Sequence, residues 1–314
     1  MAIVEHYPKD FQEFLNQFKS EEDCWNYIFE LRWPNGYTCP RCYSNKYWLT
    51  EKRLIHCSSC ENQTSITGGT IFQGTRKPLL LWFHIIWWVV AQKTGASASN
   101  LKDFMGFGSY ETAWVWLHKL RRAMVRPDRD KLVGSVEVDE TYIGGKEIGK
   151  GKQGRGAETK TLVVVAAECK GKQIGRVRFS CISDASGENL LRFIEDNIEP
   201  GSTIITDGWR GYSSLSQSKK YKHESKIISG SGQEAHELLP HVHMVDSLVK
   251  RWINGTHQGN VSPKHLSYYL DEFAFRFNRK LSTYRGKLFY RLMQQAVTTP
   301  PMPLKEIVKE NQLV

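Results

Sequence analysis

Two pairs of cysteines near the N-terminus constrain this chain more than any other sequence feature. The pairs are Cys39-Pro-Arg-Cys42 and Cys57-Ser-Ser-Cys60, with 14 residues between them. This pattern is typical of a zinc ribbon, in which each pair supplies two thiolates to one tetrahedral Zn²⁺. Segments 46–50 and 53–56 have the composition of two short strands, which a ribbon requires. A redox-active cysteine pair and two disulfides are the less favoured alternatives.

Composition limits the class of protein. The chain has 314 residues, 43 Lys and Arg against 33 Asp and Glu, and a net charge of +10. This length suits two or three domains, and the positive charge favours a polyanionic partner such as nucleic acid. The longest apolar block, Leu79–Ala91, has 13 residues, so it predicts a buried helix rather than a membrane span. The polar residues 1–19 lack a signal peptide, and we expect a cytoplasmic protein with no membrane segment.

Helical patterns surround the apolar block. Residues 7–31 predict two helices, the second capped by Ser20. Beyond the block, two helices at 98–105 and 110–124 are joined across a short turn that contains glycine. This arrangement is typical of a helix-turn-helix, and a plain helical hairpin is the alternative. The basic residues of the second of these helices are Lys119, Arg121 and Arg122.

From residue 135 onward, strand patterns replace the helical ones. We predict strands at residues 136–143, 161–168, 175–182, 202–206 and 225–228, and helices at 189–197 and 238–254. With a further helix expected between the fourth and fifth strands, the order is three strands, a helix, a strand, a helix, a strand and a helix. This is the order of an RNase H-like domain, so the sequence predicts an α/β fold with a mixed sheet.

Two acidic residues stand out in this strand order. Asp139 is expected at the end of the first strand, before Gly144-Gly145, and Asp207 ends the fourth. The two strands are neighbours in an RNase H-like sheet, so the carboxylates are expected to converge. Buried carboxylates are costly unless they are paired or bind metal, which predicts a metal site. The alternatives are an edge strand with its acids in water and, for Asp207, a simple turn.

A third ligand is expected from the helix at 238–254. His243, Asp246 and Lys250 are spaced i, i+3 and i+7, which places them on one helical face. His243 and Lys250 then reach the same site. Spacing alone fits equally an ordinary i,i+4 ion pair between Asp246 and Lys250, and a packed or capping role for His243.

Several motifs occur here in the combination seen in one protein family. Besides the cysteine pairs they are Thr64-Ser-Ile-Thr-Gly-Gly-Thr-Ile-Phe72, Thr112-Ala-Trp114 with His118-Lys-Leu-Arg-Arg122, Val138-Asp-Glu-Thr-Tyr-Ile-Gly-Gly-Lys146, Thr206-Asp-Gly-Trp-Arg-Gly-Tyr212 and Gly255-Thr-His-Gln-Gly259 with the helix that follows. Over roughly residues 8–285 the chain resembles bacterial insertion-sequence transposases. These join a Cys₄ zinc ribbon and a helix-turn-helix to an RNase H-like catalytic domain of the DDE type.

The resemblance implies specific metal ligands. The first two acids of the family correspond to Asp139 and Asp207. In many members the third residue is a glutamate seven positions before a lysine that contacts DNA. Counting back from Lys250 reaches His243, which resembles family variants with Asn or His at this position. Asp246 and Glu272 are the alternative third ligands.

The resemblance also implies a reaction and partners. Two Mg²⁺ or Mn²⁺ ions would support in-line cleavage at the element ends and strand transfer into target DNA. A histidine ligand suits Mn²⁺ better than Mg²⁺. Double-stranded DNA, with terminal repeats and target, is the expected partner of a homodimer or higher oligomer associated with the nucleoid. The expected DNA contacts are Lys119, Arg121, Arg122, Lys146, Lys150, Lys250 and Arg251.

This interpretation divides the chain into four parts. N-terminal helices and zinc ribbon occupy residues 1–75, the helix-turn-helix region 76–130, the catalytic domain 131–285, and a loosely held C-terminal tail 286–314. Three other functions remain open at this point. One is a DNA-binding regulator with a decayed catalytic domain, and another is an RNase H-like nuclease or resolvase. The third, a protein that binds a membrane surface, has only the net charge in its favour.

Overall fold

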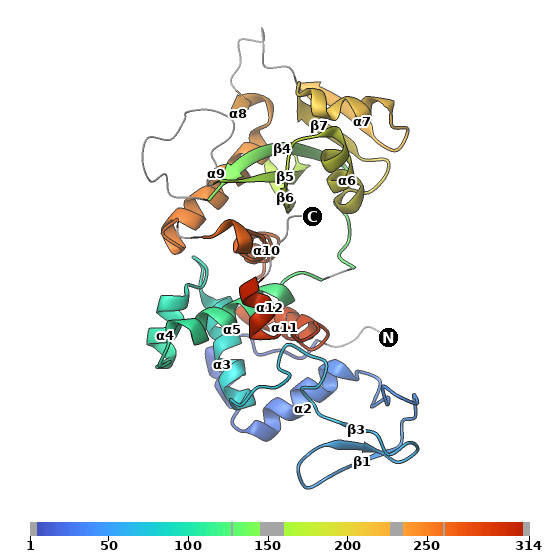
Figure 1. The fold of residues 1–314 in the computed structure, drawn as a ribbon, viewed down its shortest axis with the longest axis vertical. Helices are drawn as coiled ribbons and strands as arrows, with labels where there is room; N and C mark the ends of the chain where they lie inside the picture. Colours follow the sequence, from blue (N-terminus) through green and yellow to red (C-terminus); the bar gives the residue numbers. More distant parts are fainter. Residues whose placement is uncertain (1–4, 127, 145–159, 227–234, 260, 310–314) are drawn as a thin grey trace. The chain divides into compact units, whose positions relative to one another are not determined.

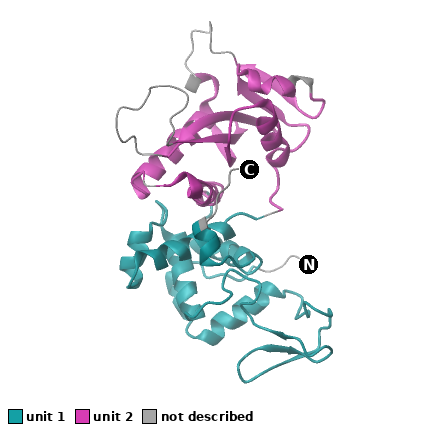
Figure 2. Cartoon of the chain, in the orientation of Figure 1, with its two compact units in different colours: residues 1–126, 281–308 teal, residues 127–280, 309–314 magenta. Residues whose placement is uncertain are grey.

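The computed structural model describes residues 5–126, 128–144, 160–226, 235–259 and 261–309. The chain forms two compact units (Figures 1 and 2). Unit 1 comprises residues 1–126 and 281–308, and unit 2 comprises residues 127–280 with the last few residues. Unit 2 is therefore inserted, in the sequence, between two segments of unit 1.

The N-terminal part of unit 1 contains two helices and a small sheet. Helix α1 spans Phe11–Gln17 and helix α2 spans Glu21–Arg32. Ser20 caps α2 as predicted: its hydroxyl accepts from the Asp23 amide, and the Asp23 carboxylate accepts from the Ser20 amide. Strands β1 (Tyr47–Leu49), β2 (Ile55–Cys57) and β3 (Gln63–Thr64) pair antiparallel in that order. The first two match the predicted ribbon strands, and the third is additional.

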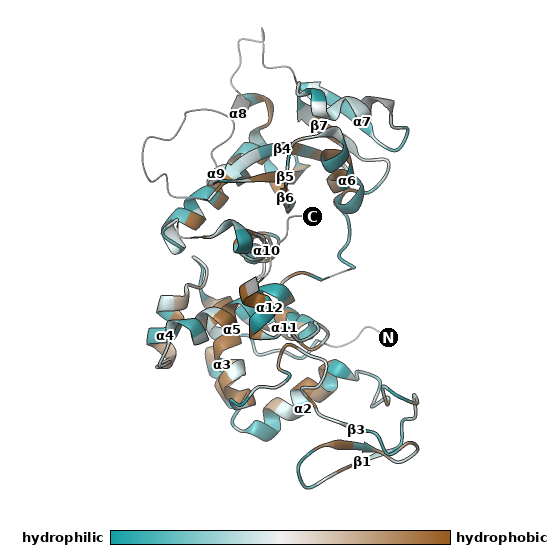
Figure 3. Ribbon diagram, in the orientation of Figure 1, coloured by the Kyte–Doolittle hydropathy of each residue, from teal (hydrophilic) through white to brown (hydrophobic). Residues whose placement is uncertain are grey.

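Helix α3 (Leu79–Ala91) lies in the core of unit 1 and begins directly after Pro78, as the apolar block predicts. Most of its side chains are buried, in keeping with a helix that is apolar on nearly every side (Figure 3). Phe14 of α1 and Phe83 of α3 both pack on Phe289, with ring centroids 5.4 and 5.7 Å apart. These contacts bring a residue from near the C-terminus into the N-terminal core.

The prediction of a loosely held tail from residue 286 is wrong for most of that segment. Helix α11 (Arg285–Ala296) has eight buried residues, and Ile307 of α12 (Leu304–Lys309) is fully buried. Gly286 packs so closely that an added Cβ would lie 1.4 Å from the carbonyl oxygen of Pro8. The Pro-rich and then polar residues 298–314 suggested a tail, whereas the apolar partners that hold α11 lie almost the whole chain length away in the sequence.

Helices α4 (Ala98–Met105) and α5 (Tyr110–Ala123) form the predicted pair. Gly106 ends α4 with φ at +65°, a left-handed conformation that favours glycine, and Ser109 caps α5. Trp116 of α5 stacks on Trp82 of α3 with ring centroids 3.7 Å apart. The pair is thus packed onto the core of unit 1 through α5. No helix of the described chain is long and apolar enough to cross a membrane.

Unit 2 is built on a five-stranded mixed sheet. Its strands are β4 (Ser135–Ile143), β5 (Thr161–Lys170), β6 (Gln173–Ile182), β7 (Thr203–Asp207) and β8 (Lys222–Lys226). The order across the sheet is β6-β5-β4-β7-β8; the first three strands pair antiparallel, while β7 is parallel to both β4 and β8. The prediction that the first and fourth strands of this domain are neighbours is confirmed, since they are β4 and β7. Strand β8 begins three residues earlier than predicted.

Helices cover both faces of this sheet. Helix α6 (Gly187–Asn197) packs over one face, with the short elements η1 (Arg210–Tyr212) and α7 (Ser213–Gln217) beside it. Helices α9 (Pro240–Thr256) and α10 (Leu266–Phe277) pack over the other, preceded by α8 (Ala235–Leu238) and η2 (Pro263–His265). Because side chains alternate along a strand, Val136 and Val138 face α6, whereas Glu137 and Asp139 face α9.

Candidate active site

The four cysteines of the ribbon come together as predicted. The Sγ atoms of Cys39 and Cys60 are 3.7 Å apart, and those of Cys42 and Cys57 are 3.5 Å apart. All four sulfurs lie within 4.8 Å of one another. Tetrahedral Zn²⁺ with Zn–S bonds near 2.3 Å separates its sulfurs by about 3.8 Å. The donor set and its spacing therefore fit a structural zinc ion.

Asp139 lies in the middle of β4 rather than at its end, because the strand continues to Ile143. What ends near Asp139 is the pairing with β7, whose last partners are Glu137 and Ile205. Asp207 is the final residue of β7, as predicted. Both aspartates lie two residues beyond that last pair, so the parallel register brings them side by side at the point where the strands separate.

Burial and neighbouring charge act together on Asp139. Its side chain is 21% exposed. The pKa of Asp139 is raised to about 7, chiefly by burial and in addition by the carboxylates of Asp207 and Asp246, while the Glu140 amide and Lys250 act in the opposite direction. Three acidic groups thus share one small region of the α9 face of the sheet. Such crowding is unfavourable unless a cation compensates it.

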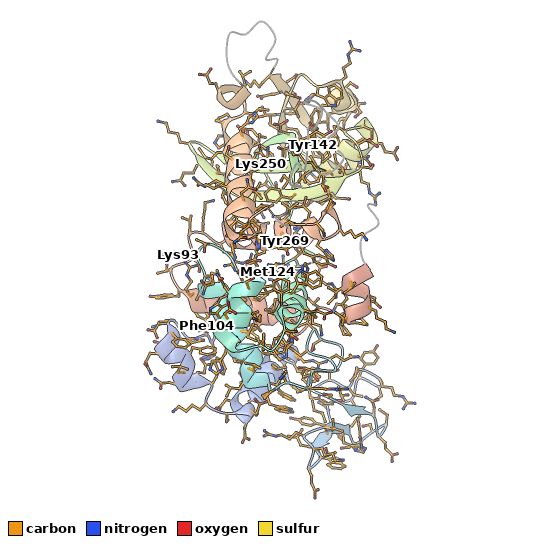
Figure 4. All side chains as sticks on the ribbon, turned by 60° about the vertical axis from the view of Figure 1, so that its left-hand side comes forward. Lys93, Phe104, Met124, Tyr142, Lys250 and Tyr269 are labelled. Atoms are coloured by element: carbon orange, nitrogen blue, oxygen red, sulfur yellow. The ribbon has the colours of Figure 1, made fainter. Side chains whose placement is uncertain are left out.

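Helix α9 supplies the remaining groups from the predicted face. The Nε2 atom of His243 lies 3.7 Å from Oδ2 of Asp139, which is too long for a hydrogen bond. Lys250 pairs with Asp246, with Nζ 2.9 Å from Oδ2. The other oxygen of Asp246, Oδ1, is buried without a hydrogen-bond partner among the described residues. Figure 4 shows Lys250 on α9, alongside the sheet.

The loop after β7 holds Asp207 in a defined orientation. Oδ1 of Asp207 accepts a hydrogen bond from the Trp209 amide at 2.9 Å. The indole nitrogen of Trp209 donates to the carbonyl of Ala185 at 3.2 Å. A Cβ at Gly211 would lie 2.6 Å from that indole and 2.8 Å from that carbonyl, so only glycine fits there. The Asp-Gly-Trp-Arg-Gly-Tyr motif therefore encodes the loop that presents Asp207.

Comparisons with known families agree with this geometry. Residues 131–278 match the model of the ISXO2-like transposase domain, and residues 19–63 match that of the transposase zinc-ribbon domain. The chain belongs to the insertion-sequence transposases. A curated relative, an uncharacterized protein in the transposable element ISH50 of Halobacterium salinarum, is 27% identical over 284 residues. That match covers 83% of this chain and 92% of the relative.

A solved structure also resembles this transposase, at low similarity. It is a simian T-cell lymphotropic virus intasome in complex with the PP2A regulatory subunit B56 gamma. The sequence identity is 13% and the TM-score 0.31, and the match covers 61% of this chain and 64% of that chain.

The expected DNA contacts of α5 are only partly exposed. Arg121 is 1% exposed, and its guanidinium donates to the carbonyl of Ala96 at 2.9 Å, so we correct its expected DNA contact to a structural role. Lys119 is half-buried, and burial lowers its pKa. Arg122 is half-buried, and its guanidinium reaches the carbonyl of Pro300. Arg121 thus serves the fold of unit 1, whereas Lys119 and Arg122 are partly exposed.

The other residues that the sequence predicts as DNA contacts or as an alternative metal ligand differ in what the structure shows of them. Arg251 of α9 is exposed, next to Lys250. Lys146 and Lys150 lie outside the described residues. Glu272 of α10 is fully buried and forms an ion pair with Arg276, with Nη2 2.7 Å from Oε1. This pairing makes Glu272 less suited to a metal than His243 or Asp246.

Two glutamates that the sequence left unassigned have specific partners. The Glu137 carboxylate accepts hydrogen bonds from the first turn of α9, and Glu140 accepts one from the Tyr212 hydroxyl at 2.5 Å. The pKa of Glu140 is raised to about 7, chiefly by burial and in addition by the charges of Asp139 and Asp207, while the hydrogen bond from Tyr212 lowers it. The only sequence signal was their position beside Asp139, two residues before it and one after.

Proposed function

We propose that this transposase cleaves DNA at the ends of its element and joins those ends to target DNA, in a reaction that depends on divalent metal ions. The observation that carries the proposal is the convergence of Asp139, Asp207 and Asp246 with His243 from three separate elements. Carboxylate oxygens suit Mg²⁺ and Mn²⁺, and an added imidazole favours Mn²⁺. The unpartnered Asp246 Oδ1 supports a cation at this position.

Each residue then has a defined task. Asp139 would hold the ions centrally and Asp207 from the β7 side, with its carboxylate oriented by the Trp209 amide. His243 would complete the ligand set, with Asp246 as the alternative. Bound divalent ions would activate the attacking oxygen and stabilise the leaving oxygen. Lys250, a point charge on the same helix, would contact a DNA phosphate near the site.

Recognition of DNA would fall mainly to unit 1. We propose that the zinc ribbon and the α4–α5 pair bind the terminal repeats, with Lys119 and Arg122 near phosphates and Arg251 assisting from unit 2. Because phosphate contacts release counterions, binding should weaken steeply with salt. A homodimer or higher assembly would hold two element ends together.

The test uses the purified full-length chain and linear DNA carrying both element ends. We expect nicked ends and joined products with Mn²⁺ or Mg²⁺, and none with Asp139→Asn. Asp196→Asn, an exposed acid on α6, is the matched control and should behave as wild type. DNA binding without cleavage in any metal would instead support a regulator, and cleavage without joined products would support a nuclease or resolvase.

A further inference from the structure

Glutamates on both sides of Asp139 connect its strand to the two segments that carry the other candidate ligands. Glu137 is 3% exposed and faces α9, like Asp139. Glu140 lies on the opposite face of β4, where its partner Tyr212 packs among the residues under α6. Buried carboxylates are costly and persist where hydrogen bonds compensate them. Their partners therefore indicate what they do.

Glu137 fixes the start of α9. Oε2 accepts the amides of His241 and Val242 at 2.7 and 2.8 Å, and Oε1 lies 2.6 Å from Nδ1 of the His241 ring. Pro240 occupies the first helical position and has no N–H to offer, so these amides are the first two donors of the helix. An anion there also interacts favourably with the helix dipole. One carboxylate thus ties the first turn of α9 to β4, two residues from Asp139.

This attachment sets the position of the α9 ligands. His243 follows the tethered amide of Val242 directly, and Asp246 lies one turn further along the same helix. A shift of the first turn would therefore move both groups relative to Asp139. The second ring nitrogen of His241 lies 2.8 Å from the carbonyl oxygen of Gly171, so the β5–β6 turn also supports this end of the helix.

Glu140 fixes the segment after Asp207 in a similar way. Tyr212 is 1% exposed, and its hydroxyl donates to Oε1 of Glu140. Tyr212 ends η1, five residues after Asp207, and the Trp209 amide in the same segment orients the Asp207 carboxylate. The hydrogen bond thus connects the Asp139 strand to the loop that presents Asp207.

The neighbouring thiol of Cys169 offers another explanation for Glu137. Glu137, Cys169 and His241 have potential ligand atoms within 4.8 Å of one another. However, both oxygens of Glu137 and both ring nitrogens of His241 already have hydrogen-bond partners. A metal there would have to break the attachment of α9, so the geometry favours the helix cap.

We propose that Glu137 and Glu140 are positioning residues, which hold α9 and the Asp207 loop on either side of Asp139 so that the ligands converge. The inference rests on the proposed metal site. A purely structural role would lower stability alone, whereas a positioning role also changes metal affinity. Groups that orient metal ligands typically contribute roughly 10- to 100-fold to metal affinity or activity.

The test compares Glu137→Gln and Tyr212→Phe with two matched controls. Glu168→Gln alters another buried carboxylate of the same sheet, which accepts the Val133 and Arg176 amides. Tyr221→Phe removes another buried hydroxyl, which donates to the Ile198 carbonyl. Neither control touches the acidic cluster. Mn²⁺ binding to the full chain is titrated by electron paramagnetic resonance without DNA, with Asp139→Asn as background, and the cleavage rate is measured at saturating DNA.

We expect roughly 10- to 100-fold weaker Mn²⁺ binding and slower cleavage for Glu137→Gln and Tyr212→Phe, with unchanged DNA affinity. The two controls should lower thermal stability and leave Mn²⁺ affinity as in wild type. Wild-type Mn²⁺ affinity in Tyr212→Phe, or in a folded Glu137→Gln, would overturn the role of that residue. If wild type binds Mn²⁺ through Asp139 without cleaving DNA, the proposed function fails while the positioning inference stands on the binding data.

Discussion

Replacing Asp139 by asparagine should stabilise the metal-free protein while it abolishes activity. Asp139 is mostly buried, and its pKa is raised from 3.8 to about 7 by burial first and then by the nearby carboxylates. A shift of this size corresponds to about 4 kcal/mol of unfavourable ionisation in the folded state. Asparagine keeps the shape and removes the charge.

The expected increase in the free energy of unfolding of Asp139→Asn is smaller than this ionisation penalty. The asparagine amide is still a buried polar group that needs water or a hydrogen-bond partner. We expect the variant to be more stable than wild type by about 2 kcal/mol, half of the ionisation penalty. For a unit of about 150 residues this corresponds to a rise of roughly 4–8 °C in the melting temperature. The site thus carries a stability penalty that a bound cation would relieve, as expected where function requires clustered charge.

The assay is thermal unfolding of zinc-loaded protein without other divalent ions, at several pH values. The folded-state pKa of Asp139 is raised, so its penalty is absent below pH 4, grows between pH 4 and 7, and is complete above about 7. The difference in melting temperature between Asp139→Asn and wild type should therefore be absent below pH 4, grow between pH 4 and 7, and be complete above about pH 7. Added Mn²⁺ should raise the melting temperature of wild type only. The charge-crowding argument would be refuted if Asp139→Asn did not raise the melting temperature, or raised it equally at every pH. It would also be refuted if Asp196→Asn raised the melting temperature by the same amount.

Three further predictions concern other parts of the chain. Cys57→Ser should remove the bound zinc, because Cys57 is a fully buried member of the Cys₄ set; metal content should fall from one Zn²⁺ per chain to none, and limited proteolysis should cut the ribbon. His243→Ala should lower the ratio of Mn²⁺- to Mg²⁺-supported cleavage, and an unchanged ratio would contradict its role as a ligand. Gly286→Ala should destabilise unit 1 by about 2–3 kcal/mol in urea unfolding, because its Cβ would collide with the Pro8 carbonyl; a neutral effect would contradict the packing of α11.

Features that depend on neighbours in the sequence were predicted well. Cysteine spacing predicted the ribbon, Ser20 predicted the start of α2, and strand order predicted that Asp139 and Asp207 lie on adjacent strands. Each of these signals is contained in a short segment or in the order of the elements. Helical spacing also predicted the α9 face that carries His243 near Asp139.

Features that depend on distant partners were missed. Arg121 has the sequence context of a DNA contact, yet it is buried, and the Ala96 carbonyl, 25 residues earlier, accepts a hydrogen bond from its guanidinium. Glu137 binds a helix that begins about a hundred residues later, and nothing near it in sequence indicates that helix. The sequence also left His243 and Asp246 as alternative third metal ligands, because which of them is nearer to Asp139 depends on how α9 packs on β4.

The return of the chain to unit 1 has a consequence for synthesis of the transposase. Phe289 fills the aromatic core around Phe14 and Phe83, and the ribosome makes it only after all of unit 2. Because domains tend to fold as they emerge, we expect unit 2 to mature while unit 1 still lacks its last helices. If unit 1 recognises the element ends, as we propose, a nascent or prematurely terminated chain competes poorly for them, because DNA recognition becomes available only after the catalytic unit has been translated.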